Sequence, residues 1–305
     1  IQEYEKKSAN EQQSTAKQYP NIITVVNETF ADIKVLGDFK TNEDYMPYFH
    51  SLKKNCVTGY TYASIVGGQT ANTEFELLTG NTLGFLSAGT TAFQLYIHGQ
   101  MPSLVSNLKA EGYSGNKAMH PFNPYNYNRP AVYKDFGFTD FIDKFDFPKN
   151  VKRVREYISD EANVDRIISE YEKNRKKTDQ PFYMYNMTIQ NHSPYDKDAA
   201  NFKQPIKIES SKYDAEANRY LNLIKYSDDS LKQLTGYFEK CKEPTIILFL
   251  GDHQPRLTDE FMNKITNGQY QTWSSEQMMK RYQVPFVIWA NYDIKEQHRS
   301  EEHTS

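Results

Sequence analysis

The chain has 305 residues, of which 38% are hydrophobic and 14% aromatic, and this is enough to bury a large core in an α/β domain. The formal net charge of −3 excludes the strongly basic surface that is typical of nucleic-acid-binding proteins. Two cysteines, Cys56 and Cys241, are too few for a disulfide framework and lack metal-ligand spacing, so we predict that they are not joined.

The first 19 residues are polar and rich in Gln and Lys. We interpret residues 1–19 as a tether that leads from a membrane region outside this sequence, and residues 20–305 as one folded domain. The longest apolar runs, "TIILFL" and "VPFVIWA", are far shorter than the ~20 residues that a membrane-spanning helix needs.

Apolar periodicity predicts strands and helices that alternate along the chain. The predicted strands cover residues 21–27, 113–120, 181–189, 245–250 and 284–290. The predicted helices cover residues 71–80, 103–112, 159–174 and 215–241. This alternation favours an α/β fold, a three-layer α/β/α sandwich with a mostly parallel central sheet.

Ligands of such sheets bind at the carboxyl ends of the strands, and here those ends carry acids and imidazoles. Glu28 follows the first strand, His192 lies in "QNHSPYD" after the third, and Asp252 and His253 follow the fourth. A mixed oxygen and nitrogen donor set suits a divalent cation such as Mn²⁺ or Zn²⁺. Adjacent residues on a regular strand face opposite ways, but at a turn both can reach one ion, and we expect Gly251 to permit the backbone geometry of that turn.

Each of these residues also has an ordinary structural interpretation. Glu28 could be a helix cap, Asp252 could cap the segment that follows it, and His253 could be a surface histidine. Their joint occurrence at several strand ends favours a site over these separate roles.

Thr70 stands directly before a predicted helix. A threonine hydroxyl is a weak nucleophile until a metal or a base activates it, and a helix N-terminus favours a bound anion. The alternative is that Thr70 only caps the helix, with Glu74 nearby in the first turn. The spacing alone leaves both interpretations open.

Five stretches together carry a resemblance to a known family. They are "PNIITVVNETFAD", "GGQTANTEFELLTG", "YNRPAVYKDFGF", "TIQNHSPYD" and "FLGDHQP". In this order, over about residues 20 to 290, they resemble the extracellular catalytic domain of the lipoteichoic acid synthase family, sulfatase-like phosphoglycerol transferases of the alkaline phosphatase superfamily. The resemblance implies a cell-membrane protein whose catalytic domain lies on the extracellular side. It also implies that the last elements of the family's C-terminal part are missing from this sequence.

The resemblance further implies a metal site. Glu28, Thr70, Asp252 and His253 match the residues that hold one divalent metal, Mn²⁺ in the family, with Zn²⁺ and Mg²⁺ as alternatives. Thr70 also matches the nucleophile, which takes up glycerol phosphate as a covalent intermediate.

Four further residues lie at positions of the substrate-handling part of the family's site, and three of them match its pattern. His192 matches a histidine that contacts the phosphate or aids the leaving group, and Arg129 an arginine that holds the phosphate. His120 matches another pocket histidine. Tyr127 departs from the family pattern, which has Trp there; a tyrosine can still stack on glycerol or a sugar.

The function implied is a metal-dependent phosphoglycerol transferase. Its donor would be a phosphatidylglycerol-type lipid at the membrane surface. Its acceptor would be a glycolipid or a polyglycerolphosphate chain, with a periplasmic-type glucan as a further alternative. A phosphoethanolamine transferase, a phosphodiesterase, a sulfatase and a non-catalytic glycan-binding module remain open. The run Thr70-Ala-Asn-Thr-Glu lacks the C/S-x-P-x-R pattern of true sulfatases, which argues against sulfate esters.

Overall fold

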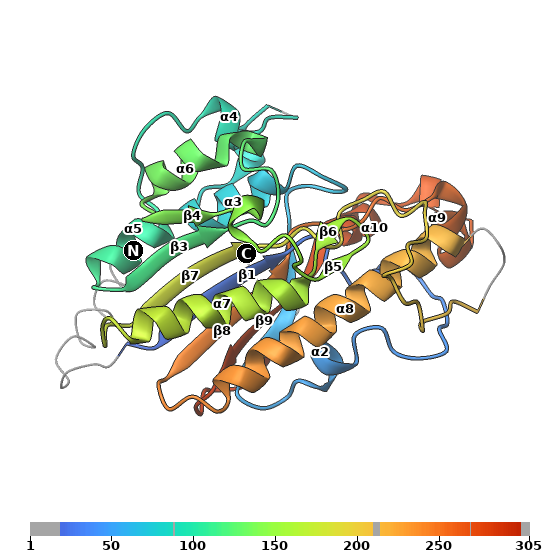
Figure 1. The fold of residues 1–305 in the computed structure, drawn as a ribbon. Coiled ribbons are helices and arrows are strands. Elements are labelled where there is room, and N and C mark those ends of the chain that lie inside the picture. Colours follow the sequence, from blue (N-terminus) through green and yellow to red (C-terminus); the bar gives the residue numbers. More distant parts are fainter. Residues whose placement is uncertain (1–18, 88, 210–213, 269, 300–305) are drawn as a thin grey trace.

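A computed structural model describes residues 19–87, 89–209, 214–268 and 270–299, and its centre is one eight-stranded sheet (Figure 1). The strands lie in the order β10 (Gln297–Arg299), β2 (Cys56–Tyr62), β9 (Gln283–Ala290), β8 (Thr245–Gly251), β1 (Asn21–Asn27), β7 (Phe182–Met187), β3 (Ser114–Met119) and β4 (Asp140–Ile142). Of the strand pairs in this sheet, only the two that involve β9 are antiparallel. The predicted α/β fold with a mostly parallel sheet is therefore confirmed.

Helices cover both faces of the sheet and make it the middle of three layers (Figure 1). Side chains of β1 alternate between two cores: Ile23 and Val25 face one, and Val26 faces the other. The first core packs against α2 (Pro47–Ser51), α7 (Asp160–Arg175), α8 (Ala215–Phe238) and α9 (Asp259–Ile265). The second packs against α3 (Thr70–Thr79), α4 (Ala92–Leu95), α5 (Leu104–Ala110) and α6 (Arg129–Phe136).

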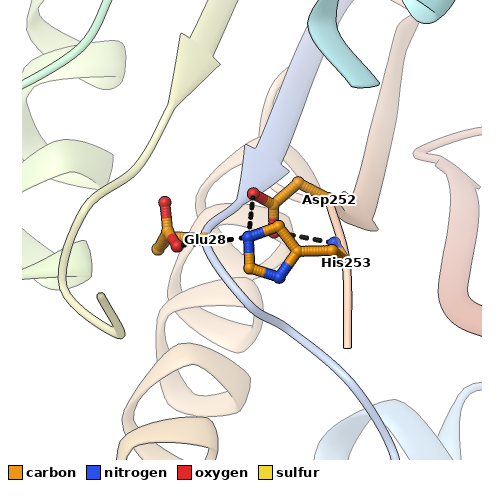
Figure 2. Close-up of side chains that lie close together, drawn as sticks. All are labelled: Glu28, Asp252 and His253. Atoms are coloured by element: carbon orange, nitrogen blue, oxygen red, sulfur yellow. Dashed lines mark hydrogen bonds and ion pairs between the residues drawn. The ribbon is translucent and has the colours of Figure 1, made fainter. Parts of the chain in front are cut away.

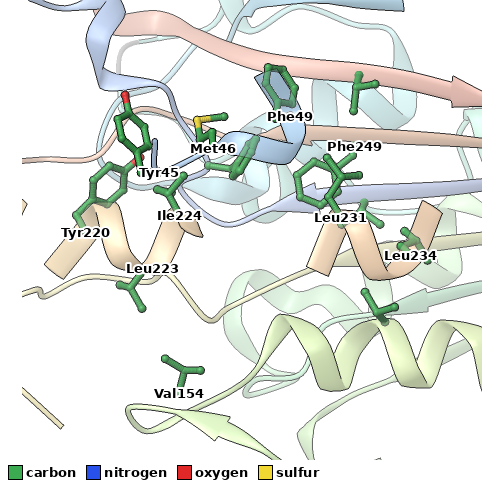
Figure 3. Close-up of a cluster of buried hydrophobic side chains, with 14 of the residues drawn as sticks. Tyr45, Met46, Phe49, Val154, Tyr220, Leu223, Ile224, Leu231, Leu234 and Phe249 are labelled. Carbon is green, nitrogen blue, oxygen red and sulfur yellow. The ribbon is translucent and has the colours of Figure 1, made fainter. Parts of the chain in front are cut away.

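The long helix α8 shows why the first core forms where it does. Its apolar residues recur at helical spacing, so they fall on one stripe. Leu231 and Leu234 of that stripe are buried in the same cluster as Phe49 of α2 and Phe249 of β8 (Figure 3). Residues 239–241 of the predicted helix lie beyond its end.

The predicted strands and helices are all present, within a few residues at their ends. Several further elements carry no strong periodic signal. They are β2, β4, β10, α2, α4, α6, α10 (Ser275–Met279) and α9, together with the hairpin of β5 (Arg153–Val154) and β6 (Tyr157–Ile158). Most are five residues or shorter, and β2 reads "CVTGYTY", which mixes polar residues and a glycine into a half-buried strand.

Three other predictions concern the ends of the chain and its thiols. Residues 1–18 of the predicted tether lie outside the described residues. Within the described part, no helix combines the length and the apolar character that crossing a bilayer requires. Cys56 and Cys241 are both free thiols, as predicted.

Candidate active site

The pairing of β1 with β8 brings the acidic residues together. The two strands are parallel and in register, with Asn27 opposite Gly251, so the next residues on each strand, Glu28 and Asp252, leave the sheet side by side. Ligand atoms of Glu28, Asp252 and His253 all lie within 4.8 Å of one another, and all three residues are buried (Figure 2). The convergence predicted for Asp252 and His253 is thus present in the structure.

Backbone amides hold the Asp252 carboxylate in place. Its Oδ1 accepts hydrogen bonds from the amides of Thr29, at 2.6 Å, and of His253, at 2.9 Å. Gly251 has a role other than the predicted one, because its φ is not in the left-handed region. A Cβ on Gly251 would lie 1.9 Å from the carbonyl oxygen of Phe30, so glycine is required for the close approach of the two chains.

The chemistry of this cluster fits a divalent cation. His253 Nδ1 donates to the carbonyl oxygen of Gln254 at 2.9 Å, which leaves the lone pair of the neutral ring on Nε2. That Nε2 lies 3.3 Å from Asp252 Oδ2 and 3.7 Å from Glu28 Oε1. Both Nε2 of His253 and Oδ2 of Asp252 are buried without a hydrogen-bond partner, and such buried polar atoms are rare unless something binds them.

The electrostatics of the cluster reflect its burial. Burial raises the pKa of Asp252 to about 6. For His253, burial favours the neutral ring, but the Asp252 and Glu28 carboxylates outweigh it and raise the pKa. A cation between these groups would offset the repulsion between the two carboxylates.

Thr70 is the first residue of α3, next to this cluster. The capping position is held by Gln69, whose backbone is left-handed with φ 65° and whose side chain makes no capping bond. Thr70 Oγ1 lies 3.4 Å from Glu28 Oε2 instead. The interpretation of Thr70 as a helix cap is therefore wrong, and so is that of His253 as a surface residue, since His253 is buried.

Arg129 is buried and paired with a carboxylate that the sequence did not single out as functional. Glu74 Oε1 accepts hydrogen bonds from Arg129 Nη2, at 2.7 Å, and from Nε, at 3.1 Å. Tyr185 donates to Glu74 Oε2 at 3.1 Å, and Tyr133 also donates to it. Burial would lower the pKa of Arg129, but Glu74 raises it, so the guanidinium stays charged. No pattern in "TANTEFELL" distinguishes buried Glu74 from Glu76, which lies on the outer side of α3.

A cavity of about 530 Å³ lies over these groups. Its wall includes the predicted residues Glu28, Thr70, His120, Tyr127, Arg129, His192 and His253. Asp252 lies beneath the wall with no exposed surface. Every residue predicted for the site therefore lies in or directly under one cavity.

The two other histidines of the cavity differ in their surroundings. His120 is buried, and burial and the charge of Arg129 hold its pKa well below the ordinary value, so its ring is neutral. Its Nδ1 donates to the carbonyl oxygen of Met187 at 3.0 Å. His192 is more open to solvent; its Nδ1 donates to the carbonyl oxygen of Ser193 at 2.6 Å, and its ring stacks on Phe122. In each ring, Nε2 remains available to a ligand.

Behind the cavity, Asp160 joins the ends of two strands. Its Oδ2 accepts from Asn27 Nδ2 at 2.7 Å and from Ser227 Oγ at 2.6 Å, and Asn191 donates to both Asn27 and Ser227. Asn27 precedes Glu28, and Asn191 precedes His192. In the sequence, Asp160 is indistinguishable from an ordinary acidic residue in the first turn of a helix, so the pattern does not predict its part in holding the site.

Comparison with known proteins identifies relatives of this chain. The Sulfatase family profile matches residues 20–305. A putative cyclic beta-1,2-glucan modification protein of Rhizobium meliloti is 33% identical over 91% of this chain and 43% of its own length. The lipoteichoic acid synthase of Staphylococcus aureus is 28% identical over 61% of this chain and 28% of its own length. The chain thus spans less than half the length of these curated relatives.

Two groups of solved structures share the fold: a phosphoglycerol transferase with a lipoteichoic acid synthase, and the EptC proteins. The Streptococcus pyogenes phosphoglycerol transferase GacH, in complex with sn-glycerol-1-phosphate, has a TM-score of 0.75 at 20% identity and covers 98% of this chain and 76% of its own. The lipoteichoic acid synthase LtaP of Listeria monocytogenes has a TM-score of 0.69 at 23% identity, covering 88% and 65%. The periplasmic domain of Escherichia coli EptC, in complex with Zn, has a TM-score of 0.56 at 12% identity, covering 90% and 73%.

Proposed function

Because this chain belongs to the Sulfatase family, we propose that it is a metal-dependent phosphoglycerol transferase of the lipoteichoic acid synthase type. It moves glycerol phosphate from a phosphatidylglycerol-type lipid to an acceptor of the cell envelope, through a covalent intermediate on Thr70. The observation that carries the proposal is the position of the Thr70 hydroxyl. It lies at the start of α3, 3.4 Å from Glu28, in a cavity that also contains the buried, charged Arg129.

The transfer takes place in two displacements at phosphorus. First, the Thr70 hydroxyl gives its proton to Glu28 Oε2, 3.4 Å away, and Oγ1 forms a bond to the donor phosphorus. The bond from phosphorus to the diacylglycerol oxygen breaks, and that oxygen takes up a proton and leaves as an alcohol. Next, an acceptor hydroxyl attacks the same phosphorus, the bond to Thr70 breaks, and Thr70 Oγ1 takes its proton back from Glu28 Oε2. His192, whose Nε2 is available, donates the proton that the diacylglycerol oxygen takes up and accepts the proton of the acceptor hydroxyl.

Glu28, Thr70, Asp252 and His253 would hold one divalent cation, with Mn²⁺ favoured and Zn²⁺ or Mg²⁺ as alternatives. When bound, it acts as a Lewis acid that lowers the pKa of the threonine hydroxyl and neutralises phosphate charge. Two backbone amides orient the Asp252 carboxylate by donating to its Oδ1, and its Oδ2, which has no hydrogen-bond partner, could bind the cation.

Arg129, His120 and Tyr127 recognise the donor. Glu74 accepts from Nε and Nη2 of the Arg129 guanidinium, and the Asn126 carbonyl oxygen accepts from Nη1 at 3.3 Å. The second N–H groups of Nη1 and Nη2 can hold phosphate oxygens. Neutral His120 can accept a hydrogen bond from a glycerol hydroxyl at its Nε2. The Tyr127 ring, 5.1 Å from the Arg129 guanidinium, can stack on the glycerol unit.

We place the chain at the outer face of the cell membrane, with residues 1–19 leading to a membrane region. The acceptor is a hydroxyl of a glycolipid or of a polyglycerolphosphate chain. The relative named for glucan modification gives a third acceptor to test, a glucan hydroxyl. Incubating the protein with labelled phosphatidylglycerol and each acceptor in turn identifies the one that gains label.

A phosphoethanolamine transferase is the second candidate, because structures of such enzymes share this fold. The two candidates differ in the headgroup that reaches Thr70. Parallel reactions with phosphatidylglycerol and phosphatidylethanolamine, analysed by intact-protein mass, show which headgroup phosphate is added to the chain. A gain of glycerol phosphate supports the proposal, and a gain of phosphoethanolamine replaces it.

Thr70→Ala tests the covalent step. The substitution removes the attacking oxygen, so release of diacylglycerol should fall by about 10⁴-fold or more while the melting curve changes little. Thr70→Ser keeps a hydroxyl and should keep part of the activity. Thr79→Ala is the matched control. It removes a hydroxyl at the other end of α3, which donates a hydrogen bond to the carbonyl oxygen of Phe75, and it should leave turnover unchanged. A stable, fully active Thr70→Ala protein would eliminate the mechanism.

A further inference from the structure

One long run of the chain has no charged side chain. Residues 77–108, between Glu76 and Lys109, contain no Asp, Glu, Lys or Arg. A quarter of the whole chain is charged, so 32 residues of average composition would carry about eight such groups. The run includes α4, the first five residues of α5 and the connection between the two helices. We call residues 80–87 and 89–101 of this run the uncharged cap.

The uncharged cap exposes large apolar side chains. Phe85 is 93% exposed, Leu95 57% and Tyr96 52%, and Tyr125 of the neighbouring loop, itself in an uncharged stretch, is 79% exposed. Single exposed apolar residues are ordinary on a protein surface, but several on one uncharged segment and on the loop that shares its cavity favour an interaction surface.

The cap lies at the mouth of the cavity. Gln94 of α4 and Tyr125 both line the cavity wall. The cap is also tied to the start of α3: Asn72 Nδ2 donates to the carbonyl oxygen of Thr90 at 2.7 Å, and Asn72 Oδ1 accepts from the amide of Ala92 at 3.0 Å. Figure 1 shows α4 at the top of the molecule, above α3 and α6. A surface that contacts the cap therefore contacts the rim of the site.

We propose that the uncharged cap docks on the lipid bilayer, and so brings the cavity mouth to the level of the lipid headgroups. The inference rests on the proposed function, in which the donor is a lipid. Exposed Phe and Leu side chains gain free energy by entering the boundary between headgroups and acyl chains, and tyrosine rings favour the headgroup level. The absence of charge removes the desolvation penalty that Lys, Asp or Glu would add at that depth.

Flotation of the 305-residue chain with neutral phosphatidylcholine vesicles tests the docking without any turnover. The parent protein should float with the vesicles, and raising the salt concentration should not release it, since no charge takes part. Phe85→Glu combined with Leu95→Glu should lower the partition coefficient by about tenfold or more. Thr70→Ala should float like the parent, which separates a failure of docking from a failure of the proposed chemistry.

Met279→Glu is the matched control, because Met279 is 46% exposed on α10, away from the cap, and should keep full flotation. Three results would overturn the inference. They are a parent protein that stays with the soluble fraction, an equal loss of flotation in Met279→Glu, and a dimer in sedimentation that the Phe85 and Leu95 substitutions dissociate. The last result would assign the cap to a second copy of the chain.

Discussion

At the scale of single residues, the pair of Arg129 and Glu74 decides how the site can hold an anion. A guanidinium can bond Glu74 along one edge and still offer N–H groups to a phosphate, whereas an ammonium offers one point charge. Burial of both partners makes this difference large, because neither charge is screened by water. The arginine is therefore needed for its shape as well as its charge.

We expect Arg129→Lys to lower kcat/KM for phosphatidylglycerol by at least about tenfold, which corresponds to roughly 1.4 kcal/mol. The reason is the loss of one of the two contacts, to Glu74 or to the phosphate. Turnover of a fluorescent phosphatidylglycerol measures the effect. Arg153→Lys, on the exposed hairpin of β5 and β6, is the control and should leave the rate unchanged. Equal rates for parent and Arg129→Lys would show that Arg129 does not grip the phosphate.

His50 gives the molecule a pH-dependent contribution to stability. The Asp32 carboxylate, 3.8 Å from Nε2, and Asp44, 2.7 Å from Nδ1, raise the pKa of His50 to about 9. Because the folded pKa lies above the ordinary 6.5, this stabilisation is fully present below pH 6.5 and is lost as the pH rises through 9.

Urea unfolding at pH 6 and at pH 9 measures this effect. The free energy of unfolding should fall between the two pH values by more in the parent than in His50→Gln. His98→Gln replaces an exposed histidine and should keep the slope of the parent. If the free energy of unfolding falls between pH 6 and pH 9 by the same amount in the parent and in His50→Gln, then His50 is not the source of the pH dependence.

The sequence was sufficient to find the candidate site residues but not the residues that hold them. Glu28, Asp252 and His253 could be found because they follow strongly apolar strands, and parallel strands end at one edge of a sheet. Glu74 and Asp160 could not, because their burial depends on what packs over a helix and not on the helix's own pattern. The sequence predicts that Gly251 serves the turn, whereas the structure shows that glycine is needed there because Phe30 approaches so closely.

At the scale of elements, the junction of β8 with the turn after β1 is the tightest point near the site. The chain passes so close to Gly251 that a Cβ would overlap the backbone of Phe30 and approach Val284 to 3.3 Å. Backbone atoms cannot move aside as a flexible side chain can. The spacing of β1 and β8, and with it the distance from Glu28 to Asp252, depends on this contact.

Gly251→Ala should therefore destabilise the protein by about 3 kcal/mol or more. Gly236→Ala is a matched control within α8, where a Cβ would meet nothing within 4 Å. Replacing this helical glycine with alanine should raise the free energy of unfolding by about 0.5–1 kcal/mol. Denaturant unfolding of both variants decides the matter. A Gly251→Ala protein as stable as the parent would mean that the two strands can separate without cost.

Elements with a strong apolar pattern in the sequence could be predicted. Short elements, and elements that mix polar and apolar residues, could not. The continuous apolar runs of β1, β8 and β9 identify central strands, because such strands are buried on both faces. The strand β2 is polar and half-buried, and it is a strand because β9 pairs with it along its whole length. That pairing is a property of the tertiary structure, which a local pattern cannot contain.

At the scale of the whole molecule, the candidate metal ligands connect distant parts of the chain. Glu28 and Thr70 come from its first quarter, and Asp252 and His253 from its last. A cation that bound the folded state alone would stabilise the entire domain by mass action, about 2.7 kcal/mol at a concentration one hundred times the Kd.

Adding Mn²⁺ after treatment with a chelator should therefore raise the Tm, and Asp252→Asn should remove most of that rise. Asp228→Asn also replaces a buried aspartate, but one that binds the amides of Tyr48 and Phe49, so it should keep the response to Mn²⁺. Differential scanning calorimetry across a Mn²⁺ titration measures both. A Tm that is the same with and without metal would contradict the assignment of these ligands.

The central place of β1 has a consequence for how the chain is made. This strand is synthesised before both of its neighbours, and its partner β8 follows about 220 residues later. At a translation rate of roughly 5–20 residues per second, β1 waits about 10 to 45 s for that partner. Until β7 is made, about 155 residues after β1, this run of apolar, β-branched residues has unpaired backbone groups on both sides, and until β8 follows it has them on one side. Such unpaired strand edges favour aggregation between nascent chains. The newly made chain thus depends on protection of its first strand until its last third has been translated.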